Sequence, residues 1–503
     1  MIEFQNVSFQ YNETDGNGIF DINLTIKNGE FLLLAGRSGC GKTTVTRCVN
    51  GLIPHFYDGS FKGRVLLKGQ DLSDMKLNEI AETVGSVFQD PRSQFFTTDT
   101  VSEVAFACEN AAIPKAEMIR RVDKSIQELK IEHLRDKSLF ELSSGERQRV
   151  AIASVYALSP EIYVFDEPSA NLDTQATDEL KEMLAFLKEK GATIIISEHR
   201  LYYLKNLIDK VIYLENGHIT GEYTRKEFLA LTDADRVAMG LRSLDQEMLT
   251  PPIRSLSDNP LLLQAKHLDF SYKKGNTVLS DINIKAAEGE IIGVIGHNGA
   301  GKSTLAELLC GLIKEQKGSV SIASEKLSPK QRILKSYFIM QDSEYQLFSE
   351  SVADELILGI EDLEGTAEKV EEVLMMLNLN EYRDRHPAAL SGGQKQRVVI
   401  AAAYMRDLKV VIFDEPTSGL DAENMKRVGG LIQKMAQRGT VAFVITHDYE
   451  LLLDTCQQIL YLKNGRVADN FALTQDSLPK VKNIFGIKED INVSKNHGVC
   501  CPL

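Results

Sequence analysis

Two glycine-rich segments, each ending in a lysine and hydroxyl residues, could bind phosphate groups. Residues 36–44 read Gly-Arg-Ser-Gly-Cys-Gly-Lys-Thr-Thr, and residues 296–304 read Gly-His-Asn-Gly-Ala-Gly-Lys-Ser-Thr. Glycines let backbone N–H groups converge on phosphate oxygens, where a β-carbon would obstruct the approach. In this pattern the lysine neutralises the β- and γ-phosphates and the next hydroxyl ligates Mg²⁺. The nucleotide-binding residues predicted from these two glycine loops are Gly36, Ser38, Gly39, Gly41, Lys42, Thr43 and Thr44, and Gly296, Asn298, Gly299, Gly301, Lys302, Ser303 and Thr304.

An aspartate and a glutamate follow an apolar run in each half of the chain. The pairs are Asp166-Glu167 and Asp414-Glu415, each between a phenylalanine and a proline. The aspartate is expected to hold Mg²⁺ and the glutamate to polarise an attacking water. Phosphoryl transfer needs charge neutralisation and in-line positioning more than covalent chemistry. The lysine, hydroxyl, aspartate and glutamate of each motif set can supply both. Glu167 and Glu415 are therefore predicted to be catalytic, with Asp166 and Asp414 as metal ligands.

A histidine follows the next apolar run in each half. His199 comes after Ile196-Ser197-Glu198, and His447 comes after Ile445-Thr446. A lone histidine is more often structural than catalytic, but one at the same offset in both halves favours a functional role. We expect both to hydrogen-bond the γ-phosphate and to hold the geometry of the water and the glutamate.

The spacing of these motifs shows that the chain contains two copies of one domain. The lysines differ by 302 − 42 = 260, and the differences 391 − 143, 414 − 166 and 447 − 199 are each 248. Independent matches would not keep one spacing across three motifs. We predict a first domain over 1–240, a linker over 241–260, a second domain over 261–470 and an extension over 471–503 without an assigned role.

Each copy alternates strand-like and helical stretches. Phe31–Ala35 leads into the first glycine loop, Thr43 opens a helix, and Thr193–Ile196 precedes His199. This alternation predicts an α/β fold with a mainly parallel sheet covered by helices. Ligands of such sheets bind at the carboxyl ends of the strands, where these motifs stand.

A serine-glycine segment in each half indicates which kind of phosphate-binding protein this chain resembles. Leu142-Ser143-Ser144-Gly145-Glu146 and Leu390-Ser391-Gly392-Gly393-Gln394 each continue to an arginine. They resemble the signature of ABC ATPases, and nearly the whole chain up to residue 470 is similar to two tandem P-loop NTPase domains of the ABC type. The resemblance implies a helical signature subdomain in each copy and head-to-tail docking of the two halves within one chain.

That docking implies two composite ATP sites, in which the signature of one copy completes the other copy's glycine loop. Ser391 and Gly393 would complete the ATP site that contains Lys42. Ser143 and Gly145 would complete the ATP site that contains Lys302. Ser144 and Glu146 depart from the family pattern, and a carboxylate there could weaken ATP binding at the second site. We still expect both sites to bind and hydrolyse ATP.

The resemblance assigns further residues by position. Tyr11 lies 42 − 11 = 31 residues before its lysine and Tyr272 lies 302 − 272 = 30 before its own; the family stacks adenine on an aromatic ring there. Gln89 and Gln341 are implied to touch Mg²⁺ or the attacking water. The implied metal ligands are Thr43, Gln89, Asp166, Ser303, Gln341 and Asp414.

A second glutamine five residues after the first narrows the family further. Gln89 and Gln94 recur as Gln341 and Gln346, each pair within an aromatic-rich segment. This pattern resembles the ATPases of energy-coupling-factor importers for vitamins or metal ions. In that family the second glutamine sits in a short extra helix that meets a transmembrane scaffold subunit, and a separate small membrane protein captures the substrate.

Composition limits the partners and the location. The formal net charge of −14 repels a phosphate backbone, so nucleic acid is not expected as a partner. No apolar run approaches the roughly 20 residues that span a bilayer, and we expect no signal peptide. The seven cysteines show no metal-ligand or disulfide spacing, which favours a reducing compartment. Together with the importer resemblance, which implies membrane subunits in other chains, these properties lead us to expect a peripheral protein on the cytoplasmic face of the cell membrane.

Three alternatives stay open at this stage. Cys500-Cys501-Pro502-Leu503 formally fits a prenylation signal, with a frayed tail as the simpler interpretation. A soluble tandem ABC factor acting on ribosomes or nucleic acid would also have two full copies and no membrane span. A non-hydrolysing ATP-gated protein would require loss of the base, whereas both Glu167 and Glu415 are present.

Overall fold

The computed structural model describes residues 1–12, 18–253, 259–273, 276–360 and 365–487. These residues fall into two units. Unit 1 contains Met1–Leu244 together with Thr417–Arg427, and unit 2 contains Asp245–Pro416 together with Val428–Leu503. A short segment of the second copy thus belongs to the first unit.

The structure does not describe all of the predicted linker or the cysteine-containing tail of the extension. Residues 254–258 of the predicted linker lie outside it. The cysteine-containing tail of the extension, within 488–503, lies outside it as well.

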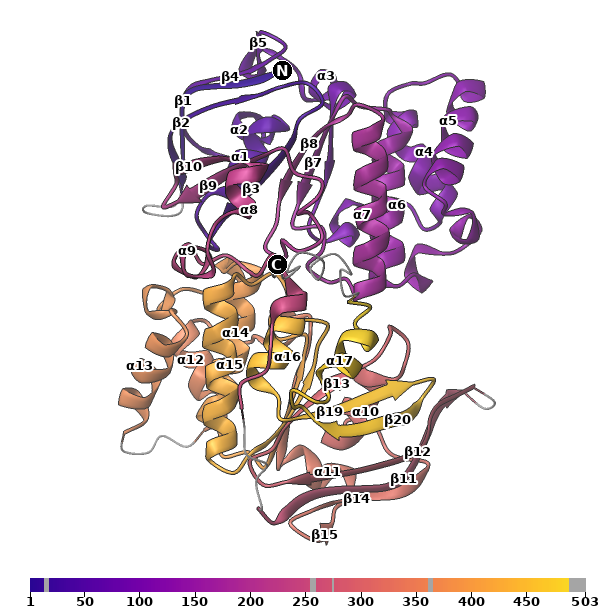
Figure 1. Ribbon diagram of the computed structural model, residues 1–503, viewed down its shortest axis with the longest axis vertical. Helices are drawn as coiled ribbons and strands as arrows, with labels where there is room; N and C mark the ends of the chain where they lie inside the picture. The colour runs from indigo at the N-terminus through magenta and orange to yellow at the C-terminus, as the bar shows by residue number, and fades with distance from the viewer. Residues whose placement is uncertain (13–17, 254–258, 274–275, 361–364, 488–503) are drawn as a thin grey trace, which may run out of the picture. The chain divides into compact units, whose positions relative to one another are not determined.

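The strands of unit 1 form two sheets (Figure 1). They are β1 (Ile2–Tyr11), β2 (Gly18–Ile26), β3 (Phe31–Gly36), β4 (Gly59–Leu67), β5 (Gln70–Asp71), β6 (Val84–Val87), β7 (Ile162–Asp166), β8 (Thr193–Ser197), β9 (Lys210–Glu215) and β10 (His218–Thr224). The larger sheet has the order β10-β9-β3-β8-β7-β6 and is parallel except for β10. The smaller sheet has the order β2-β1-β4-β5 and is antiparallel.

Burial explains why the strands of the larger sheet read as continuous apolar runs. Every residue of β3 and β8 is buried, as expected for parallel strands covered on both faces. By contrast, β10 alternates between exposed and half-buried residues, as an edge strand does. Because β3, β8 and β7 are neighbours, their carboxyl ends place the first glycine loop, His199 and Asp166 at one edge of the sheet.

The helices of unit 1 include one that follows the glycine loop and a group of three that packs beside the larger sheet. They are α1 (Lys42–Val49), α2 (Leu52–His55), α3 (Leu77–Thr83), α4 (Thr100–Asn110), α5 (Lys115–Glu128), α6 (Ser144–Ala157), α7 (Thr174–Glu189), α8 (Arg225–Leu229) and α9 (Asp233–Ala238). α1 follows the glycine loop and starts one residue earlier than predicted. α4, α5 and α6 pack together beside the sheet (Figure 1), which is the helical part that the signature resemblance implies.

Unit 2 repeats both sheets. Its strands are β11 (Leu261–Lys273), β12 (Asn276–Ala287), β13 (Ile291–Ile295), β14 (Lys317–Ile322), β15 (Glu325–Lys326), β16 (Ser336–Ile339), β17 (Val410–Asp414), β18 (Val441–Ile445), β19 (Gln458–Lys463) and β20 (Arg466–Ala472). The orders β16-β17-β18-β13-β19-β20 and β12-β11-β14-β15 match those of unit 1 strand for strand. The internal repeat predicted from motif spacing is therefore a structural repeat.

The helices of the second copy follow a similar but not identical plan, since α16 (Tyr449–Thr455) corresponds to a segment of turns in the first copy. They are α10 (Lys302–Cys310), α11 (Pro329–Ile333), α12 (Val352–Ile357), α13 (Thr366–Met376), α14 (Gly392–Met405), α15 (Ala422–Gln437), α16 (Tyr449–Thr455) and α17 (Leu478–Ile484). α17 belongs to the extension, and Phe485 just after it packs edge-on against Tyr449 of α16 at 5.3 Å between ring centroids. Within the described residues, no helix is both long enough and apolar enough to cross a bilayer.

Candidate functional site

The first glycine loop connects β3 to α1 through a backbone that glycine makes possible. Gly36, Gly39 and Gly41 all have positive φ angles, of 149°, 80° and 105°. A β-carbon on Gly36 would lie 2.3 Å from the carbonyl oxygen of Leu214, so no larger residue fits there. Gly296, Gly299 and Gly301 repeat this geometry in the second copy.

The lysine of each loop is folded back onto the loop itself. Lys42 Nζ donates to the carbonyl oxygens of Gly36 at 3.0 Å and Arg37 at 3.1 Å, and lies 3.4 Å from His199 Nε2. Both lysines are buried. A phosphate bound at the loop would offer oxygens in place of these carbonyls, so the ammonium group is already at the position where the charge is needed.

Lys302 of the second copy makes the equivalent contacts. Its Nζ donates to Gly296 O at 2.6 Å and His297 O at 3.2 Å, and lies 3.2 Å from His447 Nε2. The lysine and histidine of each motif set are therefore in contact in both copies.

A hydroxyl and a carboxylate meet next to each lysine. Thr43 Oγ1 donates to Asp166 Oδ1 at 3.2 Å, and Ser303 Oγ donates to Asp414 Oδ2 at 2.8 Å. Burial raises the pKa of Asp166, with a further contribution from the charge of Glu167, and burial likewise raises the pKa of Asp414. A cation would reverse that effect, and hydroxyl and carboxylate oxygens are the donors that Mg²⁺ prefers, so this donor set fits the ion.

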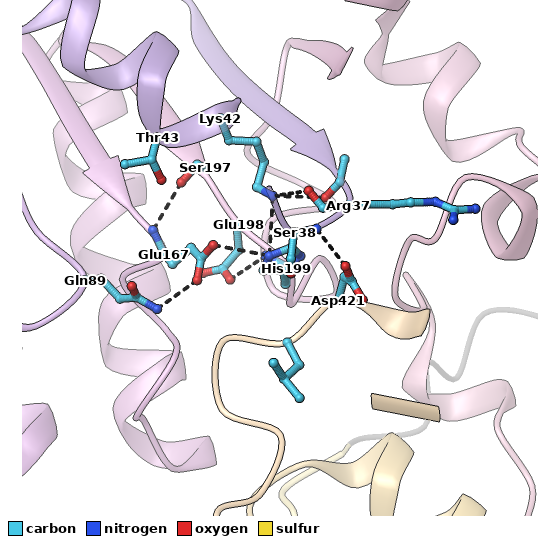
Figure 2. A network of polar contacts seen from close by, with 12 residues as sticks. Arg37, Ser38, Lys42, Thr43, Gln89, Glu167, Ser197, Glu198, His199 and Asp421 are labelled. Carbon is cyan, nitrogen blue, oxygen red and sulfur yellow. Dashed lines mark hydrogen bonds and ion pairs between the residues drawn. The ribbon is translucent and has the colours of Figure 1, made fainter. Parts of the chain in front are cut away.

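In the first copy the predicted catalytic carboxylate binds side chains (Figure 2). Glu167 Oε1 lies 3.2 Å from His199 Nε2, and Gln89 Nε2 donates to Glu167 Oε2 at 2.9 Å. Burial raises the pKa of Glu167, but the charge and hydrogen bond of His199 outweigh burial, so the pKa lies below its ordinary value. Gln89 thus contacts the glutamate directly.

In the second copy the equivalent carboxylate accepts hydrogen bonds from a backbone amide and from the hydroxyl of Thr446, whose Oγ1 donates to Glu415 Oε2 at 3.4 Å. His447 N donates to Glu415 Oε1 at 3.0 Å and to Oε2 at 3.3 Å, while His447 Nε2 lies 3.8 Å from Oε1. Both glutamates have positive φ, 45° for Glu167 and 51° for Glu415. A non-glycine residue in this region indicates local strain that the surroundings must compensate, which is frequent at functional sites.

An aspartate outside the predicted site residues contacts the first glycine loop. Asp421 lies in the segment Thr417–Arg427 of unit 1, and its Oδ2 accepts a hydrogen bond from Ser38 N at 2.6 Å (Figure 2). Arg37 pairs with Glu423 of the same segment. Residues 417–421 (Thr-Ser-Gly-Leu-Asp) and 169–173 (Ser-Ala-Asn-Leu-Asp) resemble the D-loop, a segment that links the two sites in ABC ATPases, but that resemblance does not single out the side chain of Asp421.

The same segment meets its counterpart in the first copy. Ser418 Oγ lies within hydrogen-bonding distance of two acceptors in that counterpart. They are the carbonyl oxygen of Ala170 and, at 2.6 Å, Asn171 Oδ1. Residues 169–173 and 417–421 are the two stretches that resemble D-loops. Unit 1 therefore brings both stretches into contact.

The two candidate adenine-stacking tyrosines differ in their surroundings. The hydroxyl of Tyr11 accepts a hydrogen bond from Arg47 Nη1 at 2.9 Å, and its ring packs edge-on against Tyr57 with 6.0 Å between the ring centroids. Tyr272 is 61% exposed and donates to Glu307 Oε2 at 3.0 Å. Each hydroxyl also lies near the second hydroxyl residue of its own glycine loop, Thr44 at 3.3 Å or Thr304 at 3.2 Å.

Glu146, the unusual residue of the first signature, caps its own helix. Ser143 N donates to Glu146 Oε2 at 2.8 Å, and Glu146 N donates back to Ser143 Oγ at 3.3 Å. Lys137 Nζ donates to the other carboxylate oxygen at 2.9 Å. Burial raises the pKa of Glu146, but these bonds outweigh it and lower the pKa to about 2. The carboxylate is thus paired, which limits its repulsion of a phosphate.

The second signature forms the same reciprocal cap with a neutral residue. Ser391 N donates to Gln394 Oε1 at 2.8 Å, and Gln394 N donates to Ser391 Oγ at 3.4 Å. In the first signature a β-carbon on Gly145 would lie 2.6 Å from Ala176 Cβ, which explains the glycine there. Ser143 and Gly145 belong to unit 1, and Ser391 and Gly393 to unit 2. The pairing of each signature with the other copy's glycine loop stays a prediction.

The second glutamine of each pair supports the local backbone. Gln94 and Gln346 lie in short 3₁₀ helices, Pro91–Gln94 and Ser343–Gln346. Gln94 Oε1 accepts from Phe88 N at 3.2 Å and its Nε2 donates to Ser86 O at 3.0 Å. Gln346 makes both equivalent bonds, at 2.8 and 2.7 Å. These amides therefore connect the short helix to the preceding strand.

The fold and these motif sets define a protein with two nucleotide-binding domains of the P-loop type. The family model described as "ABC transporter" matches residues 19–170 and 279–418. The chain belongs to this family of ATP-hydrolysing proteins, and the predicted fold class, the ATPase activity and the ABC resemblance are confirmed at this level.

Two relatives agree with this membership, and a solved structure shares the fold. A Treponema denticola protein named "Putative ABC transporter ATP-binding protein" is 44% identical over 93% of this chain and 96% of its own length. A Bacillus subtilis protein named "Putative HMP/thiamine import ATP-binding protein YkoD" is 32% identical over 93% of this chain and 91% of its own length. A chain in the "Model of ribosome-bound archaeal Pelota and ABCE1" has a TM-score of 0.70 at 22% identity, over 95% of this chain and 80% of that chain, and shows the shared fold.

Proposed function

We propose that this chain is the energy-coupling ATPase of a membrane importer of the energy-coupling-factor type, acting for a vitamin or a metal ion. ATP would be bound at two composite sites formed head to tail by the domains over 1–240 and 261–470. Its partners would be a transmembrane scaffold subunit and a separate small membrane subunit that captures the substrate. The chain would lie on the cytoplasmic face of the membrane.

Two complete motif sets support hydrolysis at both sites. In each copy the lysine contacts the histidine, and a glutamate lies beside that histidine. Mg²⁺, when bound, would neutralise phosphate charge; Thr43, Asp166 and Gln89 would hold it in the first copy. Their counterparts in the second copy are Ser303, Asp414 and Gln341. The glutamates would orient water, and the lysines would orient the phosphates.

The observation that carries the transport part of the proposal is an exposed aromatic ring after each glutamine pair. Phe96 is 72% exposed and Phe348 is 77% exposed. Large apolar side chains left in water next to a nucleotide-sensing segment favour a partner with an apolar surface. The end of a transmembrane helix has that chemistry.

A buried carboxylate holds each of these turns in place. Glu103 Oε2 accepts hydrogen bonds from Phe96 N at 3.1 Å and Thr97 N at 2.9 Å. Glu355 Oε2 accepts from Phe348 N and Ser349 N, both at 2.8 Å. The backbone is therefore ordered while the ring stays exposed, which lowers the entropic cost of binding a partner.

The importer relative favours this proposal over a soluble factor acting on ribosomes. The Bacillus subtilis protein named for HMP/thiamine import covers nearly all of the chain at 32% identity. The likeness to the ribosome-bound ABCE1 model, at 22% identity, concerns the fold alone. The net charge of −14 also disfavours an RNA surface.

Copurification from detergent-solubilised membranes of the native host tests the proposal. The chain with Phe96→Ala and Phe348→Ala should lose a hydrophobic scaffold subunit that the wild-type chain retains. Leu334→Ala is the matched control, since Leu334 is 82% exposed in another part of unit 2. An unchanged thermal unfolding midpoint would show that the variants are folded.

The same experiment separates the two candidate functions. Recovery of a membrane subunit with the wild-type chain, lost in the double variant and kept in the control, supports the importer. Recovery of ribosomal RNA and no membrane protein would overturn it in favour of the soluble factor.

A further inference from the structure

We propose that Arg47 and Glu307, which occupy the same position in the two copies, set opposite hydrogen-bond directions beside the two predicted phosphate sites. In the first copy the hydroxyl proton of Thr44 is left for a phosphate oxygen of ATP. In the second copy the hydroxyl proton of Thr304 is already used within the protein. This inference rests on the predicted nucleotide-binding roles of the two threonines, and it makes Arg47 and Glu307 residues that tune the affinity for ATP.

Arg47 and Glu307 lie on α1 and α10, the helices that follow the two glycine loops. They stand in the same register, since 307 − 47 equals the lysine offset of 260. Each contacts the tyrosine that is predicted to stack on adenine. A guanidinium offers only donors and a carboxylate only acceptors, whereas a tyrosine hydroxyl has one proton and can both donate and accept. The two tyrosines therefore make bonds of opposite direction to this position.

The first copy leaves the tyrosine proton for the glycine loop. Arg47 Nη1 donates to Tyr11 OH at 2.9 Å, and the guanidinium lies 4.1 Å from the ring centroid of Tyr57, which holds it in place. The Tyr11 oxygen accepts that bond with a lone pair and keeps its proton. The same hydroxyl lies 3.3 Å from Thr44 Oγ1. Tyr11 can thus donate to Thr44, which keeps its own proton for a ligand.

The second copy uses the tyrosine proton elsewhere. Tyr272 OH donates to Glu307 Oε2 at 3.0 Å, so its single proton is taken. Thr304 Oγ1 lies 3.2 Å from the same hydroxyl. Because the tyrosine has no proton left for that contact, Thr304 has to be its donor.

The direction of these bonds affects how each threonine can bind phosphate. A threonine hydroxyl has a single proton, so Thr304 must give up its bond to the tyrosine before it can donate to a phosphate oxygen. Thr44 and Thr304 are 7% and 8% exposed, so water cannot easily replace a lost bond. A hydrogen bond to a charged phosphate is stronger than one to a neutral hydroxyl, and the competing bond offsets part of that gain. We expect the competition to weaken ATP binding at the second glycine loop about two- to fivefold.

The charges of Arg47 and Glu307 act in the same sense and have to be separated from the bond direction. A guanidinium attracts the phosphates of ATP and a carboxylate repels them, whatever the direction of the bonds. Salt screens such charge effects but does not reverse a hydrogen bond. Binding is therefore measured at about 0.5 M salt, where the screening length is about 4 Å.

Full-length chains with one intact glycine loop isolate the two sites. Lys42→Ala leaves the second loop and Lys302→Ala leaves the first, because each removes the cation that is predicted to bind phosphate. Isothermal titration calorimetry with Mg²⁺ and the non-hydrolysable ATP analogue AMP-PNP gives the Kd of the remaining loop. The thermal unfolding midpoint shows whether each variant is folded.

Two substitutions should tighten binding at the second loop. In the Lys42→Ala chain, Tyr272→Phe and Glu307→Met should each lower the Kd about two- to fivefold, because each ends the competition for the proton of Thr304. Combining them should give no further gain, since both act on the same proton. With Thr304→Val added, neither should lower the Kd. A Kd that Tyr272→Phe leaves unchanged, or gains that add, would overturn the inference.

The matching changes at the first loop should have the opposite sign. In the Lys302→Ala chain, Tyr11→Phe should not lower the Kd, because Tyr11 does not compete for the proton of Thr44. Arg47→Glu should raise the Kd about two- to fivefold above that of the matched Arg47→Met chain, because the new carboxylate takes the proton of Tyr11 and Thr44 then has to donate to it. Tightening by Tyr11→Phe, or equal Kd values for the two Arg47 variants, would overturn the inference.

These measurements are independent of the importer proposal. None of them involves a membrane subunit, so an overturned inference leaves the importer role to its own copurification test. Binding of AMP-PNP by a chain with both Lys42→Ala and Lys302→Ala, as tight as by the wild-type chain, would instead overturn the assignment of the glycine loops as phosphate sites.

Discussion

The two predicted nucleotide sites contain the same motif residues, but the hydrogen bonds between these residues differ. In the first copy Glu167 contacts the side chains of His199 and Gln89, whereas in the second Glu415 contacts the backbone of His447. The residue before each histidine differs as well: Glu198 accepts from His199 N at 2.7 Å, whereas Thr446, at the matching position since 446 − 198 = 248, donates to Glu415 Oε2 at 3.4 Å. Identical motifs therefore do not guarantee identical sites, because residues between the motifs decide which hydrogen bonds the motif residues make.

The largest effect is expected from removal of the two carboxylates that are proposed to be catalytic. Glu167→Gln and Glu415→Gln, made separately, should each lose substantial ATPase activity, by about a hundredfold or more at the site concerned, because the base that orients water is gone. Steady-state ATP hydrolysis measures this. Glu161→Gln, an exposed residue paired with Lys68, is a matched control that should keep its activity. Wild-type turnover by either site variant would refute the view that both sites hydrolyse ATP.

The second copy contains a buried ion pair that the first copy lacks, and its loss should lower the stability of the second copy. Arg332 is fully buried and donates to Glu315 at 2.6 and 3.2 Å, whereas the first copy has the buried Ile80 at the matching position, since 332 − 80 equals the glutamine offset 341 − 89. Glu315→Ala should cost about 3–5 kcal/mol, because it leaves a buried charge unpaired. Urea unfolding measures this. Glu315→Ala combined with Arg332→Ile, which removes both charges and places the isoleucine of the first copy at position 332, should recover most of the loss.

The same pair gives a pH dependence of stability. Burial raises the pKa of Glu315, but the hydrogen bond from Arg332 outweighs it, so the pKa in the folded state lies below the ordinary value of 4.5. A lowered folded pKa gives stability that is fully present above pH 4.5 and is lost as the pH falls through the folded pKa. Acid unfolding of the wild-type chain should therefore show a loss in this range that the Glu315→Ala and Arg332→Ile double variant lacks. An identical acid profile of the two chains would contradict the prediction.

Smaller effects are expected from the tyrosines. If each ring stacks on adenine, Tyr11→Ala and Tyr272→Ala should raise KM for ATP about two- to tenfold, and the corresponding Phe variants should not, because the ring supplies the contact. Kinetics with ATP check this. Comparable KM changes in the Phe and Ala variants would point to the hydroxyl contacts with Thr44 and Thr304 instead.

The smallest effect is expected at the unusual signature residue. Glu146→Gln should change ATP turnover by less than about twofold, because glutamine can form the same reciprocal cap that Gln394 forms and because Lys137 already pairs the carboxylate. ATPase kinetics over a range of ATP concentrations would detect a change. A marked fall in KM would show that the carboxylate repels the phosphate, as the sequence suggested.

Much of the fold followed from patterns that act locally. Glycine loops, buried strand runs such as Phe31–Ala35 and the fixed spacing between motifs predicted two α/β domains, and the element limits shifted by about one residue, as at Lys42. The contact between Ser38 and Asp421 was not predictable, because it joins residues far apart in the chain. The role of Gln94 was also missed, since its amide supports its own strand.

The sequence by itself determined the family, the repeat and the identity of the groups around each phosphate site, because backbone freedom and side-chain chemistry are properties of the residues themselves. Only the tertiary structure decided which partner each carboxylate takes. A buried carboxylate binds whichever donors the packed chain brings within reach, and those donors come from distant segments. Glu167 and Glu415 are the same residue type in the same motif, and their surroundings give them different bonds.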